Sequence, residues 1–136
     1  MSLQGFCSTK NVSGSLASFG LLVLRVAVCA MMLTHGLAKM SNFSALSQTF
    51  DPIGMGGTLS LSLVIFAEVF CAIAVILGLF TRLAAIPLII AMCVAVSVHF
   101  GQDFKWMEPA LLYLTAFTAI LITGPGSYSV DRLIWK

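Results

Sequence analysis

The stretch LLVLRVAVCAMMLTHGLAKM, residues 21–40, is apolar enough to cross a membrane, yet it carries Arg25, His35 and Lys39. Ionisable side chains are costly in hydrocarbon, and within a span they usually face a protein interior or a water-filled cavity. At about 100° per residue along a helix, these three side chains and Gly36 share one sector roughly 120° wide. The stretch therefore predicts a transmembrane helix with one polar face.

The composition of the whole chain extends this prediction. The 136 residues are 60% hydrophobic and 9% charged, whereas an average soluble domain is about 45–50% apolar and about 25% charged. So few charges cannot cover the surface of a soluble fold, and the apolar residues fall in long blocks, so we expect an integral membrane protein surrounded by lipid bilayer. The net charge of +2 comes from singly scattered basic residues, which indicates no nucleic-acid partner.

The apolar blocks predict four spans, at about residues 16–40, 58–80, 83–98 and 109–123. Mostly short connections favour an all-α membrane protein, an antiparallel four-transmembrane-helix bundle with short loops. Residues 1–15 form a polar N-terminal segment, and residues 16–136 form one transmembrane domain with a short amphipathic tail. The loop charges predict that both termini are cytoplasmic, with Lys10, Arg82, Arg132 and Lys136 inside and Lys39 and Lys105 outside.

Motifs for a bound cofactor do not occur in the sequence. Its four cysteines, Cys7, Cys29, Cys71 and Cys93, lack C-x-x-C and metal-ligand spacing, and inside apolar blocks they are expected to behave as small hydrophobes. The chain has no haem-attachment motif, dinucleotide fingerprint or iron–sulfur pattern, so no covalently bound cofactor and no metal are expected. Arg25 interrupts the first apolar run and no small-residue cleavage site follows, which argues against a signal peptide.

Glu68 is the acidic residue that lies deep in a predicted span. At about 1.5 Å per residue it lies roughly 18 Å from the cytoplasmic boundary, between Arg25 at roughly 8 Å and His35 at roughly 22 Å. We therefore expect Glu68 to pair with Arg25, with His35, or with both through water. The alternative is that an Arg25–Glu68 pair only fixes the packing of the bundle. Lys39, Arg82 and Lys105 are interpreted as interfacial anchors at span ends.

A second group of polar residues is predicted at the outer mouth of the bundle. Lys39 ends the first span, His99 ends the third, Glu108 opens the fourth, and Tyr113 follows below it. If these faces point inward, they ring a cavity that opens outward and has Glu68 at its floor. The alternative is that His99 and Glu108 are solvated helix ends. His35, His99 and Glu108 are chemically able to bind a metal, but they lack motif spacing.

Several motifs resemble the DoxX family. The segments LRVAVCAMMLTHGLAKM, FAEV, LGLFTRLAA and WMEPALLYLTAFTAILITGPGSYSVDRLI are similar to the family's patterns and follow its order over about residues 20–135. The resemblance implies a four-span bacterial inner-membrane protein related to the membrane subunit of a thiosulfate–quinone oxidoreductase. It carries over, by position, the candidate site residues Arg25, His35, Lys39, Glu68 and Glu108, and the motif residues Gly36, Thr81, Arg82, Gly124, Pro125, Ser129 and Asp131.

Two classes of function follow from these residues. In the first, the buried carboxylate and a nearby imidazole hydrogen-bond a quinone, and the chain is at most the membrane subunit of an oxidoreductase that receives electrons from a redox partner protein or a soluble donor. In the second, the polar site binds or transports a lipid or small solute, which for transport requires a homo-oligomer, or the chain is a membrane scaffold for a soluble partner.

Overall fold

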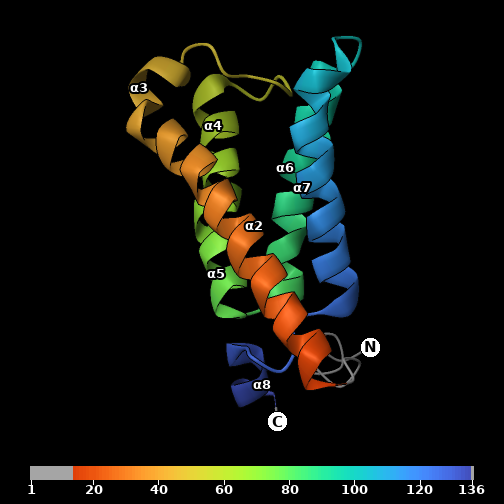
Figure 1. Cartoon of the computed structure of the whole chain (residues 1–136). Coiled ribbons are helices and arrows are strands. Elements are labelled where there is room, and N and C mark those ends of the chain that lie inside the picture. The colour runs from red at the N-terminus through yellow and green to blue at the C-terminus, as the bar shows by residue number, and fades with distance from the viewer. Residues whose placement is uncertain (1–13, 136) are drawn as a thin grey trace.

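The computed structural model describes residues 14–135, which form helices joined by turns (Figure 1). Four helical segments are long and apolar enough to cross a membrane: Ser15–Ser41, Gly57–Leu77, Thr81–His99 and Phe104–Thr123. The predicted all-α architecture with four spans is confirmed. Of the predicted polar segment over residues 1–15, all but residues 14 and 15 lie outside the described residues, as does Cys7.

The first span is one long helix, α2 (Ser15–Ser41). It ends at Asn42, whose backbone N–H and side-chain Nδ2 both donate to the Ala38 carbonyl, at 3.2 and 2.9 Å. The short helix α3 (Phe43–Leu46) follows. The segment between α3 and α4 then crosses toward the ends of α6 and α7 before the chain returns to the second span (Figure 1).

The second span is a composite of three consecutive helical segments. These are α4 (Gly57–Ile65), the π-helix η1 (Phe66–Cys71) and α5 (Ala72–Leu77). The sequence predicts an uninterrupted span here, and the π-helical turn is a feature that hydropathy does not reveal. A π-helix adds a residue to the turn and is frequent at functional sites. Glu68 lies within it.

The third and fourth spans, α6 (Thr81–His99) and α7 (Phe104–Thr123), pack closely against one another. The structure begins α7 five residues before the predicted start at residue 109. Its first turns carry the exposed residues Lys105 and Glu108, which hydropathy cannot distinguish from a loop. The helix ends at Gly124, which has a φ of 81°, and the chain closes with α8 (Val130–Ile134).

The helices α2 and α6 both contact the second span, whereas α2 and α7 touch over a small area. The buried core lies where the four spans meet and contains Cys29, Met32, Val75, Leu88, Phe117 and Ile120. The outward faces carry exposed large apolar side chains, as expected for helices solvated by lipid. The start of α2 and the helix α8 lie at the same end of the bundle, here called the terminal end (Figure 1). There the Ser18 Oγ donates to the Ser127 Oγ at 2.9 Å.

Candidate functional site

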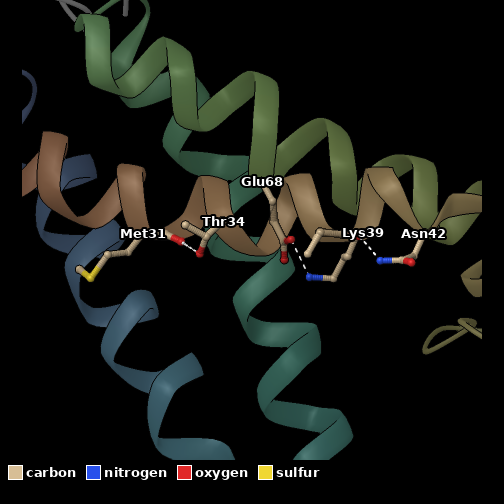
Figure 2. Close-up of polar contacts among 6 residues, drawn as sticks. Met31, Thr34, Lys39, Asn42 and Glu68 are labelled. Carbon is tan, nitrogen blue, oxygen red and sulfur yellow. Dashed lines mark hydrogen bonds and ion pairs between the residues drawn. The ribbon is translucent and has the colours of Figure 1, made fainter.

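An ion pair lies inside the bundle between the first and second spans. The Lys39 Nζ of α2 donates to the Glu68 Oε2 of η1 at 2.7 Å, and Figure 2 shows the two side chains pointing toward one another. The Glu68 side chain is 5% exposed and that of Lys39 is 24% exposed. A carboxylate buried this deeply in an apolar protein requires a partner, and Lys39 supplies it.

The directions of the two helices explain why these side chains meet. Every Cα–Cβ bond in a helix tilts toward the N-terminus of that helix. Lys39 is close to the C-terminal end of α2, so its stem runs inward along the span. Glu68 belongs to an antiparallel segment that starts at Gly57, so its carboxylate is directed back toward the end where Lys39 lies. Lys39 therefore lies in the last turn of α2 and also pairs with Glu68, a contact that its interpretation as an interfacial anchor did not include.

Gly36 lets the two helices approach closely enough for this pair to form. A Cβ placed on Gly36 would lie 2.7 Å from the Val69 Cγ2 and 2.9 Å from the Glu68 Cβ. Both distances are shorter than real Cβ contacts allow, so a side chain at this position would push α2 away from η1. Gly36 lies one helical turn before Lys39, on the same face. The glycine is thus a structural requirement of the site.

Two hollows meet at the ion pair. The large cavity, of about 400 Å³, lies beneath the segment between α3 and α4, with Thr49, Phe50, Asp51 and Pro52 on one side and Val94, Ala95 and Val98 of α6 on the other. The small cavity, of about 210 Å³, lies between α2 and α7 and is lined by Met32, His35, Met92, Trp106, Pro109, Ala110 and Tyr113. Lys39, Glu68, Ala95 and His99 line both cavities.

The remaining candidate residues at this end take different positions. His35 is exposed and its ring meets that of Tyr113 edge to face, with 5.9 Å between ring centroids, across the small cavity. His99 lines both cavities and its Nδ1 lies 3.2 Å from the Gln102 Oε1. Glu108 is exposed at the start of α7 and lines neither cavity. The predicted ring therefore holds for His35 and His99 but not for Glu108.

Arg25 is buried at the opposite end of the bundle and does not pair with Glu68. Its guanidinium donates to the backbone carbonyls of Pro125 and Tyr128, and to that of Ile76 at 3.4 Å. The predicted Arg25–Glu68 pair is wrong because the Arg25 side chain, like every side chain of α2, is directed toward the N-terminus of the helix and so away from Glu68. The buried cation is instead stabilised by these backbone carbonyls and by electrostatic attraction to the Asp131 carboxylate.

The motif residues other than Gly36 lie at the terminal end, the same end as Arg25. The Asp131 carboxylate, 1% exposed, accepts hydrogen bonds from the backbone N–H groups of Phe80 and Thr81 at 2.6 and 2.9 Å. Arg82 donates to the Ile122 carbonyl at 3.2 Å, and the Ser129 Oγ accepts from the Arg132 N–H at the start of α8. These bonds hold the C-terminal segment against the start of α6 and give this end of the bundle a structural role.

Asp51 is a residue at the large cavity that the sequence did not single out for the site. Its carboxylate accepts hydrogen bonds from the Met55 and Gly56 N–H groups and from the Ser60 Oγ, at 2.9, 3.1 and 2.9 Å. These bonds, that from Ser60 foremost, lower the pKa of Asp51 below its ordinary value of 3.8. The Asp51-Pro52 pair was predicted as turn chemistry, and only the fold brings this turn over the cavity. Residues 14–135 contain no group of three or more His, Cys, Asp or Glu able to hold a metal ion.

These features define a helical membrane protein with four spans and an intramembrane ion pair beside two cavities. The profile of the DoxX family matches residues 20–102, more than half of the chain. The chain therefore belongs to the DoxX family, as its motifs predicted.

Its relatives are bacterial membrane proteins. The chain is 28% identical to the inner membrane protein YqjF of Escherichia coli (strain K12), over 89% of this chain and 96% of the relative. It is 30% identical to the inner membrane protein YphA of the same organism, over 82% and 88%, and 29% identical to the uncharacterized membrane protein Rv3486 of Mycobacterium tuberculosis, over 85% and 81%. No solved structure gives a significant match. Together with the four apolar helices, the relatives support a multi-pass protein of the bacterial inner membrane.

Proposed function

We propose that the Lys39–Glu68 site binds the head group of a lipophilic molecule from the bilayer, and that this molecule is a membrane quinone. The observation that carries the proposal is the ion pair itself, which lies where the two cavities meet. An ion pair needed only for packing would be covered by side chains on all sides. Here both charged groups border space that a small molecule can occupy.

The chemistry of the two side chains suits the two redox forms of a quinone. An ammonium group carries three donor hydrogens, of which the bond to Glu68 uses one, so Lys39 can also donate to a quinone carbonyl. The Glu68 carboxylate can accept a hydrogen bond from the hydroxyl of a quinol, and the imidazole of His99, which lines the same cavity, can also form a hydrogen bond with the head group. The site therefore supplies groups that bind both forms.

In this proposal the chain is the membrane subunit of an oxidoreductase. The sequence carries no haem, iron–sulfur or dinucleotide motif, so electrons would come from a redox partner protein or a soluble donor. We also propose that both termini are cytoplasmic, because Arg82 and Arg132 lie at the terminal end and Lys39 and Lys105 at the other. The two cavities then lie toward the outer face of the membrane.

The two tryptophans of the chain allow a direct binding experiment. Trp106 lines the small cavity, whereas Trp135 lies at the terminal end, with its ring 6.3 Å from that of Phe80. Quinones quench indole fluorescence at short range. In Trp135→Phe protein, a short-tailed quinone titrated into detergent micelles should therefore quench Trp106 in a saturable way. In the matched Trp106→Phe protein, Trp135 should show only the linear quenching expected from quinone dissolved in the micelle.

Glu68→Gln in the Trp135→Phe background tests the site. The carboxamide keeps the shape of Glu68 but removes the negative charge, and we expect the apparent Kd for the quinone to rise about tenfold or more, a loss of about 1.4 kcal/mol. Linear quenching of Trp106 in the unmutated site, or a Kd that Glu68→Gln leaves unchanged, would contradict the proposal. In that event saturable binding of phospholipid or a small solute would support a lipid-binding or transport protein, and transport would require a homo-oligomer.

A further inference from the structure

An apolar groove lies between the second and third spans, beside the large cavity that borders the ion pair. The groove, of about 280 Å³, is lined by Pro52, Ile53, Ser60, Leu63, Val64, Phe66, Pro87, Ile90, Ala91 and Val94. The single hydroxyl among them, that of Ser60, donates to Asp51 at 2.9 Å. The remaining lining offers only hydrocarbon surface, so the groove suits an alkyl or isoprenoid chain and not a polar solute.

The packing of the helices explains why the groove is open. The third span, α6, contacts η1 and α5 but separates from α4, and Figure 1 shows α4 and α6 diverging toward the end of the bundle that carries α3. Leu63, Phe66 and Ile90, which are 47%, 51% and 58% exposed, border the groove. Exposed apolar side chains on transmembrane helices face lipid, so the groove opens toward the hydrocarbon of the bilayer.

The groove lies directly beside the large cavity. Pro52, Val64, Ala91 and Val94 line both, so the apolar space and the polar space are neighbours that share one set of side chains. An amphiphilic molecule can therefore place its head group at Lys39 and Glu68 while its tail stays in an apolar environment. The small cavity between α2 and α7 lacks this match, because His35, Lys39, Glu68, His99 and Tyr113 all line it.

We infer that the groove between α4 and α6 holds the hydrocarbon tail of the molecule whose head group binds at Lys39–Glu68. The inference rests on the proposed function and adds to it a tail-binding site. The tail leaves one apolar environment for another and gains only packing contacts in the groove. A tail that cannot enter a filled groove would, however, keep its head group from reaching Lys39 and Glu68. A block in the groove should therefore act on tailed ligands alone.

The test uses two quinones and two variants in the Trp135→Phe protein. One quinone carries a decyl tail, and the other has the same head group with no tail. The double variant Leu63→Phe with Ile90→Phe places two rings in the groove at positions that line neither cavity, and Cys93→Phe, at an exposed position of α6 outside the lining, is the control. Saturable quenching of Trp106 gives the apparent Kd for each combination, expressed per quinone in the micelle.

We expect Leu63→Phe with Ile90→Phe to raise the Kd of the tailed quinone about tenfold or more and to leave that of the tailless quinone within about twofold, while Cys93→Phe changes neither. Equal losses for both quinones, or no loss for the tailed one, would overturn the inference, since the added ring would then act on the head-group site or on nothing. Failure of the proposed function has a different signature, because neither quinone would then bind in a saturable way before Leu63 and Ile90 are changed.

Discussion

The Lys39–Glu68 pair makes a quantitative prediction for a double-mutant cycle. At 2.7 Å, Coulomb's law with an effective dielectric constant of about 20 gives an attraction of about 6 kcal/mol, which is an upper bound before desolvation. Lys39→Met leaves a buried carboxylate without its cation and should cost about 3 kcal/mol. Glu68→Leu leaves an ammonium that is already 24% exposed and can turn toward water, so it should cost less, about 1–2 kcal/mol.

The double variant Lys39→Met with Glu68→Leu removes both charges and replaces them with apolar groups. We therefore expect it to be more stable than Lys39→Met alone and to show a coupling energy of about 2 kcal/mol. The free energy of unfolding is measured by circular dichroism as a function of the mole fraction of sodium dodecyl sulfate in mixed micelles. Losses that add to within about 0.5 kcal/mol would refute the pairing. Arg25→Met with Glu68→Leu is the control cycle, which should be additive.

Three further predictions concern the surroundings of the pair. Gly36→Ala should destabilise the protein by about 1–3 kcal/mol in the same unfolding assay, because the new Cβ meets Val69 and Glu68; an unchanged midpoint would show that α2 and η1 are not in close contact. Arg25→Met should cost about 3 kcal/mol, since it leaves three carbonyls without their donor, and Arg25→Lys should not restore this; full rescue by lysine would contradict the carbonyl contacts. Because hydrogen bonds lower the pKa of Asp51, its stabilisation should be complete above pH 3.8 and lost as the pH falls through its lowered pKa. The difference in Tm between wild type and Asp51→Asn should therefore be constant at neutral pH and shrink only in acid; a difference that shrinks already near neutral pH would contradict this.

The spans could be predicted from the sequence because the bilayer imposes a strong constraint on length and hydropathy. Each of the four apolar blocks became a helix, and the stop at Gly124 followed from a glycine–proline pair at the end of the block. The start of α7 could not be found in this way, because its first turns are polar and exposed. The π-helical turn around Glu68 was equally hidden, since apolar residues surround it whichever hydrogen-bonding pattern the backbone adopts.

The polar face of the first span was predicted, but the pairing across it was not. Arg25, His35 and Lys39 share a sector, and depth alone placed Glu68 between Arg25 and His35. The number of residues along a helix gives the depth of each Cα atom in the membrane. The charged group of a long side chain lies several ångströms from its Cα atom, toward the N-terminus of the helix. That direction takes Arg25 away from Glu68 and brings Lys39 to it. Loop residues such as Asp51 reach the cavity through a chain path that no local pattern encodes.

The most direct test of a quinone site at Lys39 and Glu68 is the identity of the molecule that copurifies with the protein. An organic extract of protein purified in mild detergent is analysed by mass spectrometry beside the Glu68→Gln variant, whose helical content and thermal midpoint are checked by circular dichroism. A quinone site at Lys39 and Glu68 predicts a quinone in nearly stoichiometric amount in the wild type and its loss from a variant that remains folded. Bulk phospholipid in both samples with no enriched quinone, or an equal quinone content in both, would contradict a quinone site at Lys39 and Glu68.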